Sequence, residues 1–271
     1  MDLDTDRSVD QLTRISRDTD ARQVAMGAYA GLIDLLERLE PRHWEAQTEC
    51  TGWDVAAMVG HLIGAGEAGA SLRESLRQQW HGKRQAARFG GNSLDAANDL
   101  QVREHAALTP GERIAALKEV APRAVTGRLG LPRPLRRVPV PLDAGGSTAT
   151  GMPRTFPMGQ LMDVVYTRDV WLHTVDIARA TSVVHEPDPQ VDGRIVEDVV
   201  AEWAERHGEP VSLVLDGPAG GRFRQGSGGV DLHLDAVEFC RILSGRAEPS
   251  DAGLGADASD AHRLLLARLV F

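Results

Sequence analysis

The stretch TRDVWLHTVDIARA, residues 167–180, combines the apolar spacing of a core helix with an unusual set of polar residues. Asp169, His173 and Asp176 share one face of the predicted helix. Such a face either meets water or holds a metal ion, because side chains at positions i and i+4 converge on one side of a helix. The helix itself is indicated by four apolar residues at helical spacing: Trp171, Leu172, Val175 and Ile177.

Composition excludes several classes of protein. The 271 residues are 42% hydrophobic and 25% charged, and the net charge of -9 provides no basic surface for nucleic acid. No apolar run approaches the roughly 18 residues that a membrane helix needs, and no signal segment opens the chain. Cys50 and Cys240 lie too far apart in sequence to indicate a disulfide framework or a cysteine-rich zinc site. We therefore expect a cytoplasmic protein, either a monomer or a homodimer, without nucleic-acid or membrane partners.

Helical spacing predicts most of the first two thirds of the chain. Thr51-x-x-Asp54 has the pattern of a capping box, and Thr109 followed by Pro110 is typical of a helix start. Six prolines in residues 130–157, between the helices predicted at 109–129 and 158–181, exclude a continuous helix there and suggest a substrate-site loop. Arg133, Arg136 and Arg137 in this loop either contact an acidic substrate or are solvated. The predicted helices cover residues 21–40, 51–80, 94–108, 109–129 and 158–181.

The end of the chain has a different texture. After a further helix at 191–207, three short alternating runs separated by glycines indicate three antiparallel strands, and two helices follow them. The predicted fold class is therefore α+β: a polar N-terminal tail at 1–20, a helical bundle at 21–186 and a small α+β domain at 187–271.

His61 is a second candidate for metal chemistry. It lies in the apolar run AAMVGHLIG, where it is either an ordinary core or surface histidine or a ligand, and Gly60 and Gly64 leave room beside it. Two helices of a bundle can present three inward ligands to one ion, and three protein ligands with an open position are typical of catalytic zinc. Asp176 would then orient an imidazole or cap a neighbouring helix.

Two motifs carry a resemblance to a known family. CTGWDVAAMVGHL (50–62) together with TRDVWLHTVDIARA resembles the signature helices of the mycothiol-dependent maleylpyruvate isomerase family, whose N-terminal domain is a DinB-like four-helix bundle. VSLVLDG and GGVDLHLDAVEFCRILSGRAE are similar to its C-terminal domain, which resembles sterol carrier proteins. The resemblance implies a divalent metal, usually zinc, on His61, Asp169 and His173, with Asp169 standing where the isomerase has Glu. It also implies an active-site role for Arg246, whose alternative role is that of a cation at a helix end.

The function that the resemblance implies is thiol chemistry. A metal ion would activate mycothiol, the low-molecular-weight thiol cosubstrate, for attack on a small electrophilic substrate, which gives an isomerase or an S-transferase. Two alternatives stay open from the residues: a hydrolase that uses zinc-bound water, and a non-catalytic protein that binds a small molecule or lipid.

Overall fold

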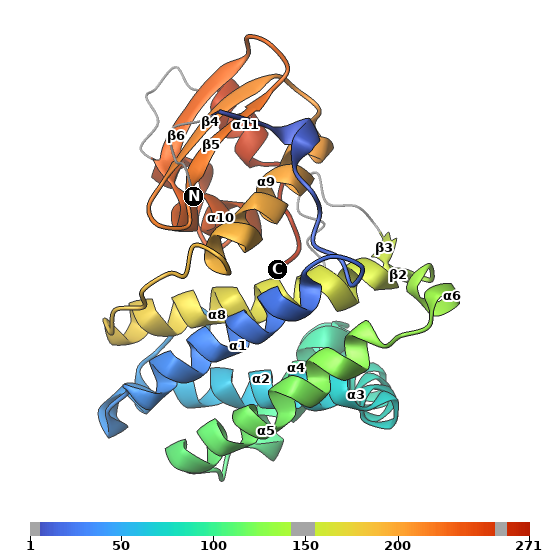
Figure 1. Ribbon diagram of the computed structural model, residues 1–271. Coiled ribbons are helices and arrows are strands. Elements are labelled where there is room, and N and C mark those ends of the chain that lie inside the picture. Colours follow the sequence, from blue (N-terminus) through green and yellow to red (C-terminus); the bar gives the residue numbers. More distant parts are fainter. Residues whose placement is uncertain (1–5, 142–154, 253–258) are drawn as a thin grey trace. The chain divides into compact units, whose positions relative to one another are not determined.

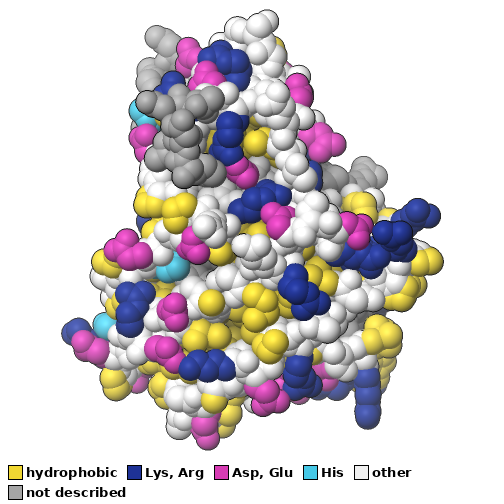
Figure 2. All heavy atoms as spheres, in the orientation of Figure 1, with side chains coloured by type: hydrophobic (Ala, Val, Ile, Leu, Met, Phe, Trp, Pro, Cys, Tyr) yellow, Lys and Arg dark blue, Asp and Glu magenta, His cyan; other side chains and the backbone are white. Residues whose placement is uncertain are grey.

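The computed structural model describes residues 6–141, 155–252 and 259–271, and the chain folds as two compact units (Figure 1). The helical unit contains the described residues between 17 and 185. The sheet unit contains residues 6–16 and the described residues from 186 onwards. An α+β fold with a helical bundle is thus confirmed. Within the described residues, no helix is both long and apolar enough to span a membrane. Acidic and basic side chains are intermixed on the face shown in Figure 2.

Four long helices form the core of the helical unit. α2 packs on α5 and α8, and α1 packs on α5 and α8. The α2–α5 contact is close because glycines face it: a Cβ on Gly127 would lie 2.4 Å from the Gly69 carbonyl oxygen. Leu32, Leu62 and Leu172 are fully buried between these helices. The four are α1 (Ala21–Glu37), α2 (Val55–Ala70), α5 (Pro110–Leu129) and α8 (Tyr166–Thr181).

The predicted helix at 51–80 is two helices. Ser71 leaves helical conformation, and its hydroxyl accepts a hydrogen bond from the Glu74 amide to cap α3 (Leu72–Gln85). The capping box predicted at Thr51 is wrong, because Asp54 is itself the N-cap of α2 and accepts from the Ala57 amide at 2.7 Å. α4 (Ser93–Glu104) follows a 3₁₀ turn at Ala86–Phe89 and packs on α2 and α3. The predicted cap at Thr109 is confirmed as a full capping box.

The helix predicted at 158–181 begins irregularly. It opens with α7 (Met158–Gln160) and a π-helical segment, Leu161–Val165, before α8. The buried carboxylate of Asp163 anchors this segment by pairing with the Arg136 guanidinium and accepting a hydrogen bond from the Arg17 amide. The hydrogen bonds of a π segment span five residues instead of the four of an α-helix, so the segment carries one extra residue. Such segments are frequent beside functional sites.

The proline-rich connection is partly regular. It contains α6 (Arg133–Arg136), and β2 (Pro139–Pro141) pairs antiparallel with β3 (Thr155–Pro157). Arg136 has a structural role through Asp163, whereas Arg133 and Arg137 are exposed. Residues 142–154 of the predicted substrate loop lie outside the described residues.

The sheet of the sheet unit has the strand order β1-β5-β4-β6. The prediction of three antiparallel strands is correct for β4 with β5 and wrong for β6, which pairs parallel with the other side of β4. The glycine-rich loop between β5 and β6 therefore passes the start of β4, where a Cβ on Gly229 (φ +91°) would lie 2.0 Å from the Pro210 carbonyl oxygen. The strands are β1 (Arg7–Ser8), β4 (Val211–Asp216), β5 (Gly221–Gln225) and β6 (Val230–Asp235).

Part of the predicted N-terminal tail belongs to this sheet. β1 pairs parallel with β5, and a 3₁₀ turn at Val9–Gln11 follows it. Arg14 forms an ion pair with the fully buried Asp198, and the Ile15 amide donates to the same carboxylate at 2.7 Å. The polar composition gave no sign that this segment is ordered, because it is held by backbone pairing and ion pairs and not by apolar residues. The helices of the unit are α9 (Asp192–His207), α10 (Ala236–Ser244) and α11 (Ser259–Leu265), with a 3₁₀ turn at Pro249–Ala252.

Candidate metal centre

The three predicted ligands meet inside the helical unit. His61 lies in the middle of α2, and Asp169 and His173 lie one turn apart on α8. Asp169 Oδ2 is 3.6 Å from His61 Nε2, and Asp169 Oδ1 is 3.3 Å from His173 Nε2. One donor atom from each residue lies within 4.8 Å of the others. The shorter aspartate side chain therefore reaches both imidazoles.

The cluster is buried enough to protect a bound ion from competing water. His61 and His173 are 7% and 4% exposed. The Asp169 side chain is 21% exposed, so solvent reaches the cluster at this residue. Trp53, in the turn before α2, lies against both imidazoles, with its ring centroid 4.9 Å from that of His61 and 6.3 Å from that of His173.

Asp176 fixes the orientation of His173. Its Oδ2 lies 3.0 Å from His173 Nδ1, and the carboxylate is fully buried. An ionised carboxylate can only accept a hydrogen bond, so Nδ1 carries a proton, and Nε2 is the ring nitrogen that faces Asp169. This is the orienting role considered for Asp176 from the sequence.

A chain of amides fixes the orientation of His61. Gln78 Nε2 donates to the Gly64 carbonyl and to Glu74, both of which can only accept. Gln78 Oε1 therefore accepts from Gln101 Nε2 at 2.7 Å, and Gln101 Oε1 is left to accept from His61 Nδ1 at 2.7 Å. Nδ1 of His61 therefore carries a proton, and Nε2 is the ring nitrogen that faces Asp169, where it could bind a metal ion.

The glycines beside His61 make room for this chain. A Cβ on Gly64 would lie 2.6 Å from the Gln101 side chain, and a Cβ on Gly60 would lie 3.2 Å from Arg113 Nη1. The space that the sequence suggested for an ion is thus occupied by α4 and by Arg113. Gln101 and Gln78 carry no signal in the sequence, because their relation to His61 depends on how α3 and α4 pack on α2.

Gln101→Leu is expected to weaken metal binding by about 10- to 100-fold, because it removes the acceptor that holds the His61 proton on Nδ1. The dissociation constant for zinc, measured by chelator competition, checks this. Gln79→Leu is the matched control, since Gln79 is exposed on α3 and its amide donates to the Ser75 hydroxyl. Equal zinc affinity of the Gln101→Leu variant and the wild type would contradict the orienting role.

The charges in the cluster are strongly coupled. Burial raises the pKa of Asp169, but the positive charge and hydrogen bond of His173, with a hydrogen bond from His61, outweigh it and hold that pKa well below its ordinary value. Burial lowers the pKa of His173, but the charge of Asp169 and hydrogen bonds to Asp169 and Asp176 raise it well above its ordinary value. Without a metal ion, a protonated His173 supplies the positive charge beside Asp169.

The comparisons with known proteins bear on this geometry. The family model described as the mycothiol maleylpyruvate isomerase N-terminal domain matches residues 25–178, which include all three donors. The chain belongs to this family. No curated protein matches it significantly.

Two solved structures share the fold along most of the chain. A crystal structure of the mycothiol-dependent maleylpyruvate isomerase has a TM-score of 0.51 and 16% identity, covering 89% of this chain and 92% of the other. A mutant of the same enzyme matches with a TM-score of 0.51 and 16% identity, covering 91% and 94%. At this identity the likeness establishes the shared fold.

Cys50 is a residue near the centre that sequence reasoning missed. Its Sγ lies 3.9 Å from Asp176 Oδ2, and Cys50, His173 and Asp176 form a second group of potential ligands within 4.8 Å. His173 belongs to both groups, facing Asp169 through Nε2 and Asp176 through Nδ1. The family signature begins at Cys50, but the residue alone gave no sign of this position.

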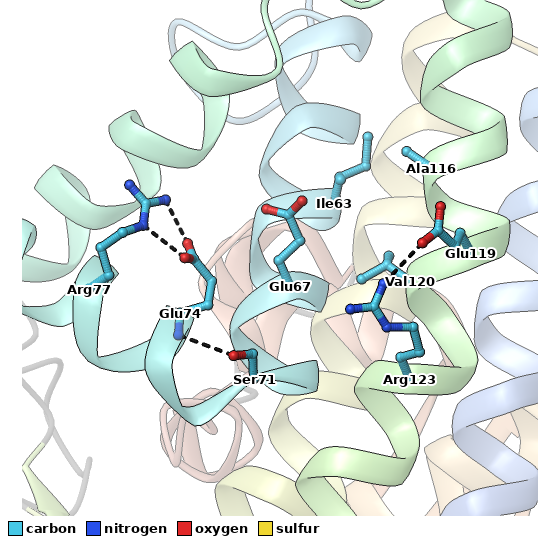
Figure 3. Close-up of a pocket in the computed structure, with 9 residues that line it drawn as sticks. All are labelled: Ile63, Glu67, Ser71, Glu74, Arg77, Ala116, Glu119, Val120 and Arg123. Atoms are coloured by element: carbon cyan, nitrogen blue, oxygen red, sulfur yellow. Dashed lines mark hydrogen bonds and ion pairs between the residues drawn. The ribbon is translucent and has the colours of Figure 1, made fainter.

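One cleft of the helical unit is separate from the donor cluster. It measures about 380 Å³ and lies between α2, α3 and α5 (Figure 3). Its polar side chains are largely paired with one another: Glu74 with Arg77, and Glu119 with Arg123. None of the three donors lines it. Glu74 connects this cleft to the amide chain behind His61.

Arg246 lies in the sheet unit, directly after α10. Gly245 ends that helix in the left-handed conformation (φ +84°), and the Arg246 amide donates to the Arg241 carbonyl at 2.9 Å. Gly245 is thus required by the turn, and Arg246 is the residue that follows it. The role of Arg246 in catalysis remains a prediction from the family resemblance.

Proposed function

We propose that this member of the maleylpyruvate isomerase family is a metal-dependent, mycothiol-using isomerase or S-transferase that acts on a small electrophilic substrate. The observation that carries the proposal is the convergence of His61, Asp169 and His173 at one point, with the Nδ1 atom of each histidine facing an acceptor. Family membership supports mycothiol as the thiol.

The donor set fits a divalent metal ion. Two imidazole nitrogens and a carboxylate oxygen are donors that zinc takes at catalytic sites, where a fourth position stays open. Nδ1 of each imidazole is bonded to an acceptor, Gln101 for His61 and Asp176 for His173, so Nε2 is the nitrogen available to a metal ion. Both Nε2 atoms face the same carboxylate, that of Asp169, and this convergence favours a ligand role over a purely structural one.

The chemistry follows from these donors. A bound divalent ion would stabilise a thiolate and so supply a nucleophile at neutral pH. His61 and His173 would bind through Nε2, and Asp169 would contribute one negative charge at the exposed side of the cluster. The buried amides and Asp176 keep the imidazoles in place, and Trp53 limits the access of water to them. Arg246 is proposed to hold a substrate carboxylate.

The direct test is to incubate zinc-loaded protein with mycothiol and a panel of electrophiles that includes maleylpyruvate. Isomerised acid or an S-conjugate, identified by mass and retention time, is expected only when the thiol is present. Hydrolysis of a substrate in the panel without added thiol would replace the proposal with a hydrolase that uses metal-bound water. A protein that binds no divalent ion, yields no product and co-purifies with lipid would instead be a binding protein.

A further inference from the structure

The helix α3 exposes its apolar side chains and buries polar or small ones. Leu72, Leu76 and Trp80 lie four residues apart and therefore share one face, the apolar stripe of α3. They are 70%, 57% and 61% exposed, whereas the buried residues of the helix are Gln78 and Gly82. A helix at the surface of a globular protein ordinarily turns its apolar stripe towards the core. In α3 this arrangement is reversed.

The buried side of α3 fixes its orientation. Gln78 donates to the Gly64 carbonyl of α2 at 2.9 Å and accepts from Gln101 Nε2 at 2.7 Å. A Cβ on Gly82 would lie 2.3 Å from the Ser93 carbonyl oxygen, so α3 meets the start of α4 at backbone distance. Rolling the helix to bury the apolar stripe would break both contacts. The apolar stripe is therefore a built surface of the helical unit, and grouped exposed apolar side chains of this kind mark interaction sites.

The charges around the apolar stripe are positive, although the whole chain carries a net charge of -9. Glu74, the one acidic residue of α3, pairs with Arg77. The Arg84 guanidinium lies over the Trp80 ring, 5.1 Å from its centroid. These charges favour an anionic partner. Four exposed cations of α3 and the turn after it form no ion pair with any described residue: Arg73, Lys83, Arg84 and Arg88.

The position of Lys83 favours a bilayer over a protein as that partner. At about 100° per residue, Lys83 falls between Leu72 and Leu76 on the helix surface. At a bilayer its long side chain would reach the lipid phosphates while its methylene groups stay beside the leucines. A second copy of this chain, docked on the same stripe by a twofold axis, would bring like charges together. One helix stripe is also narrow beside the roughly 800 Å² per partner that stable protein interfaces bury.

We propose that α3 lies on the surface of an anionic bilayer, with Leu72, Leu76 and Trp80 inserted among the lipid headgroups and the four cations against the phosphates. Basic amphipathic helices with Trp and Leu on the apolar face bind membranes in this way. The expectation of a protein without membrane partners came from the lack of a spanning segment, which an interfacial helix does not need. The inference goes beyond the proposed function, because it requires neither the metal nor the thiol.

The test is co-sedimentation of the full chain with vesicles of equal parts phosphatidylglycerol and phosphatidylcholine, compared with phosphatidylcholine alone. Binding is expected only with the anionic vesicles and should weaken as salt is added. Leu76→Gln should lower the partition coefficient about tenfold and Lys83→Gln about fivefold. Val184→Gln is the matched apolar control, since Val184 is 64% exposed after α8, and Arg22→Gln is the charge control, exposed on α1.

Trp80 reports insertion directly. Its fluorescence should shift to the blue with anionic vesicles, and Trp80→Gln should abolish the shift, because the other four tryptophans are buried or half-buried. No binding to anionic vesicles, equal binding to both kinds of vesicle, or unchanged partitioning of Leu76→Gln and Lys83→Gln would each overturn the inference. A dimer that Trp80→Gln dissociates, in a protein that binds no vesicles, would assign the apolar stripe to a second copy and overturn it as well.

Discussion

His173→Ala is expected to lose zinc at stoichiometric concentrations and to lower thiol-dependent turnover by more than about 100-fold. Loss of an outer partner of a ligand costs about 10- to 100-fold in affinity or activity, and removal of the ligand itself costs more. His173 also carries the hydrogen bond to Asp176, so its removal leaves a fully buried carboxylate without that partner. Metal content by mass spectrometry of the native protein, together with initial rates, checks the prediction.

His61→Ala should give the same loss, because His61 supplies the ligand from the other helix. His233→Ala is the control: its side chain is 65% exposed in the sheet unit and pairs with Asp216. Circular dichroism of each variant separates metal loss from unfolding. Full zinc occupancy in folded His61→Ala and His173→Ala variants would show that the ion binds elsewhere.

Zinc affinity is expected to rise about tenfold per pH unit between pH 6 and 8. The negative charge of Asp169 helps to raise the pKa of His173 well above its ordinary value, so in this range the metal-free protein holds a proton that zinc must displace. Each bound ion should release about one proton from His173. Calorimetry at pH 7 in two buffers of different ionisation enthalpy measures that release.

The same pKa shifts set the stability of the metal-free protein. The raised pKa of His173 contributes stability that is complete below the unfolded value of about 6.5 and is lost as pH rises through the folded pKa. The lowered pKa of Asp169 contributes stability above the unfolded value of about 3.9, which is lost as pH falls through the folded pKa. Asp169→Asn should lower the pKa of His173 and reduce proton release; undiminished release from that variant would contradict this assignment.

The sequence predicted the parts of the site that follow helical spacing. Asp169 and His173 lie one turn apart on α8, so their shared face follows from periodicity alone. The pairing of that face with His61 depended on the family resemblance, since no local rule brings α2 and α8 together. Asp176 was placed correctly as a possible support because it lies three residues after His173 on the same helix.

Other features depend on contacts that periodicity does not encode. Gln101 and Gln78 act through the packing of α3 and α4 on α2. The parallel pairing of β6 was missed because alternation identifies a strand without giving its neighbour. The break at Ser71 was missed because apolar residues continue on both sides of it, although serine is a common cap.

The π segment Leu161–Val165 determines which side of α8 faces α2. An α-helix turns by about 100° per residue, so deleting one residue there to restore a regular helix would rotate the polar face by that angle relative to Asp163 and its anchors. Asp169 and His173 would then turn away from His61 without any change in their own spacing. The one extra residue of the π segment therefore sets the angle between the end of the helix that Asp163 anchors and the face that carries Asp169 and His173.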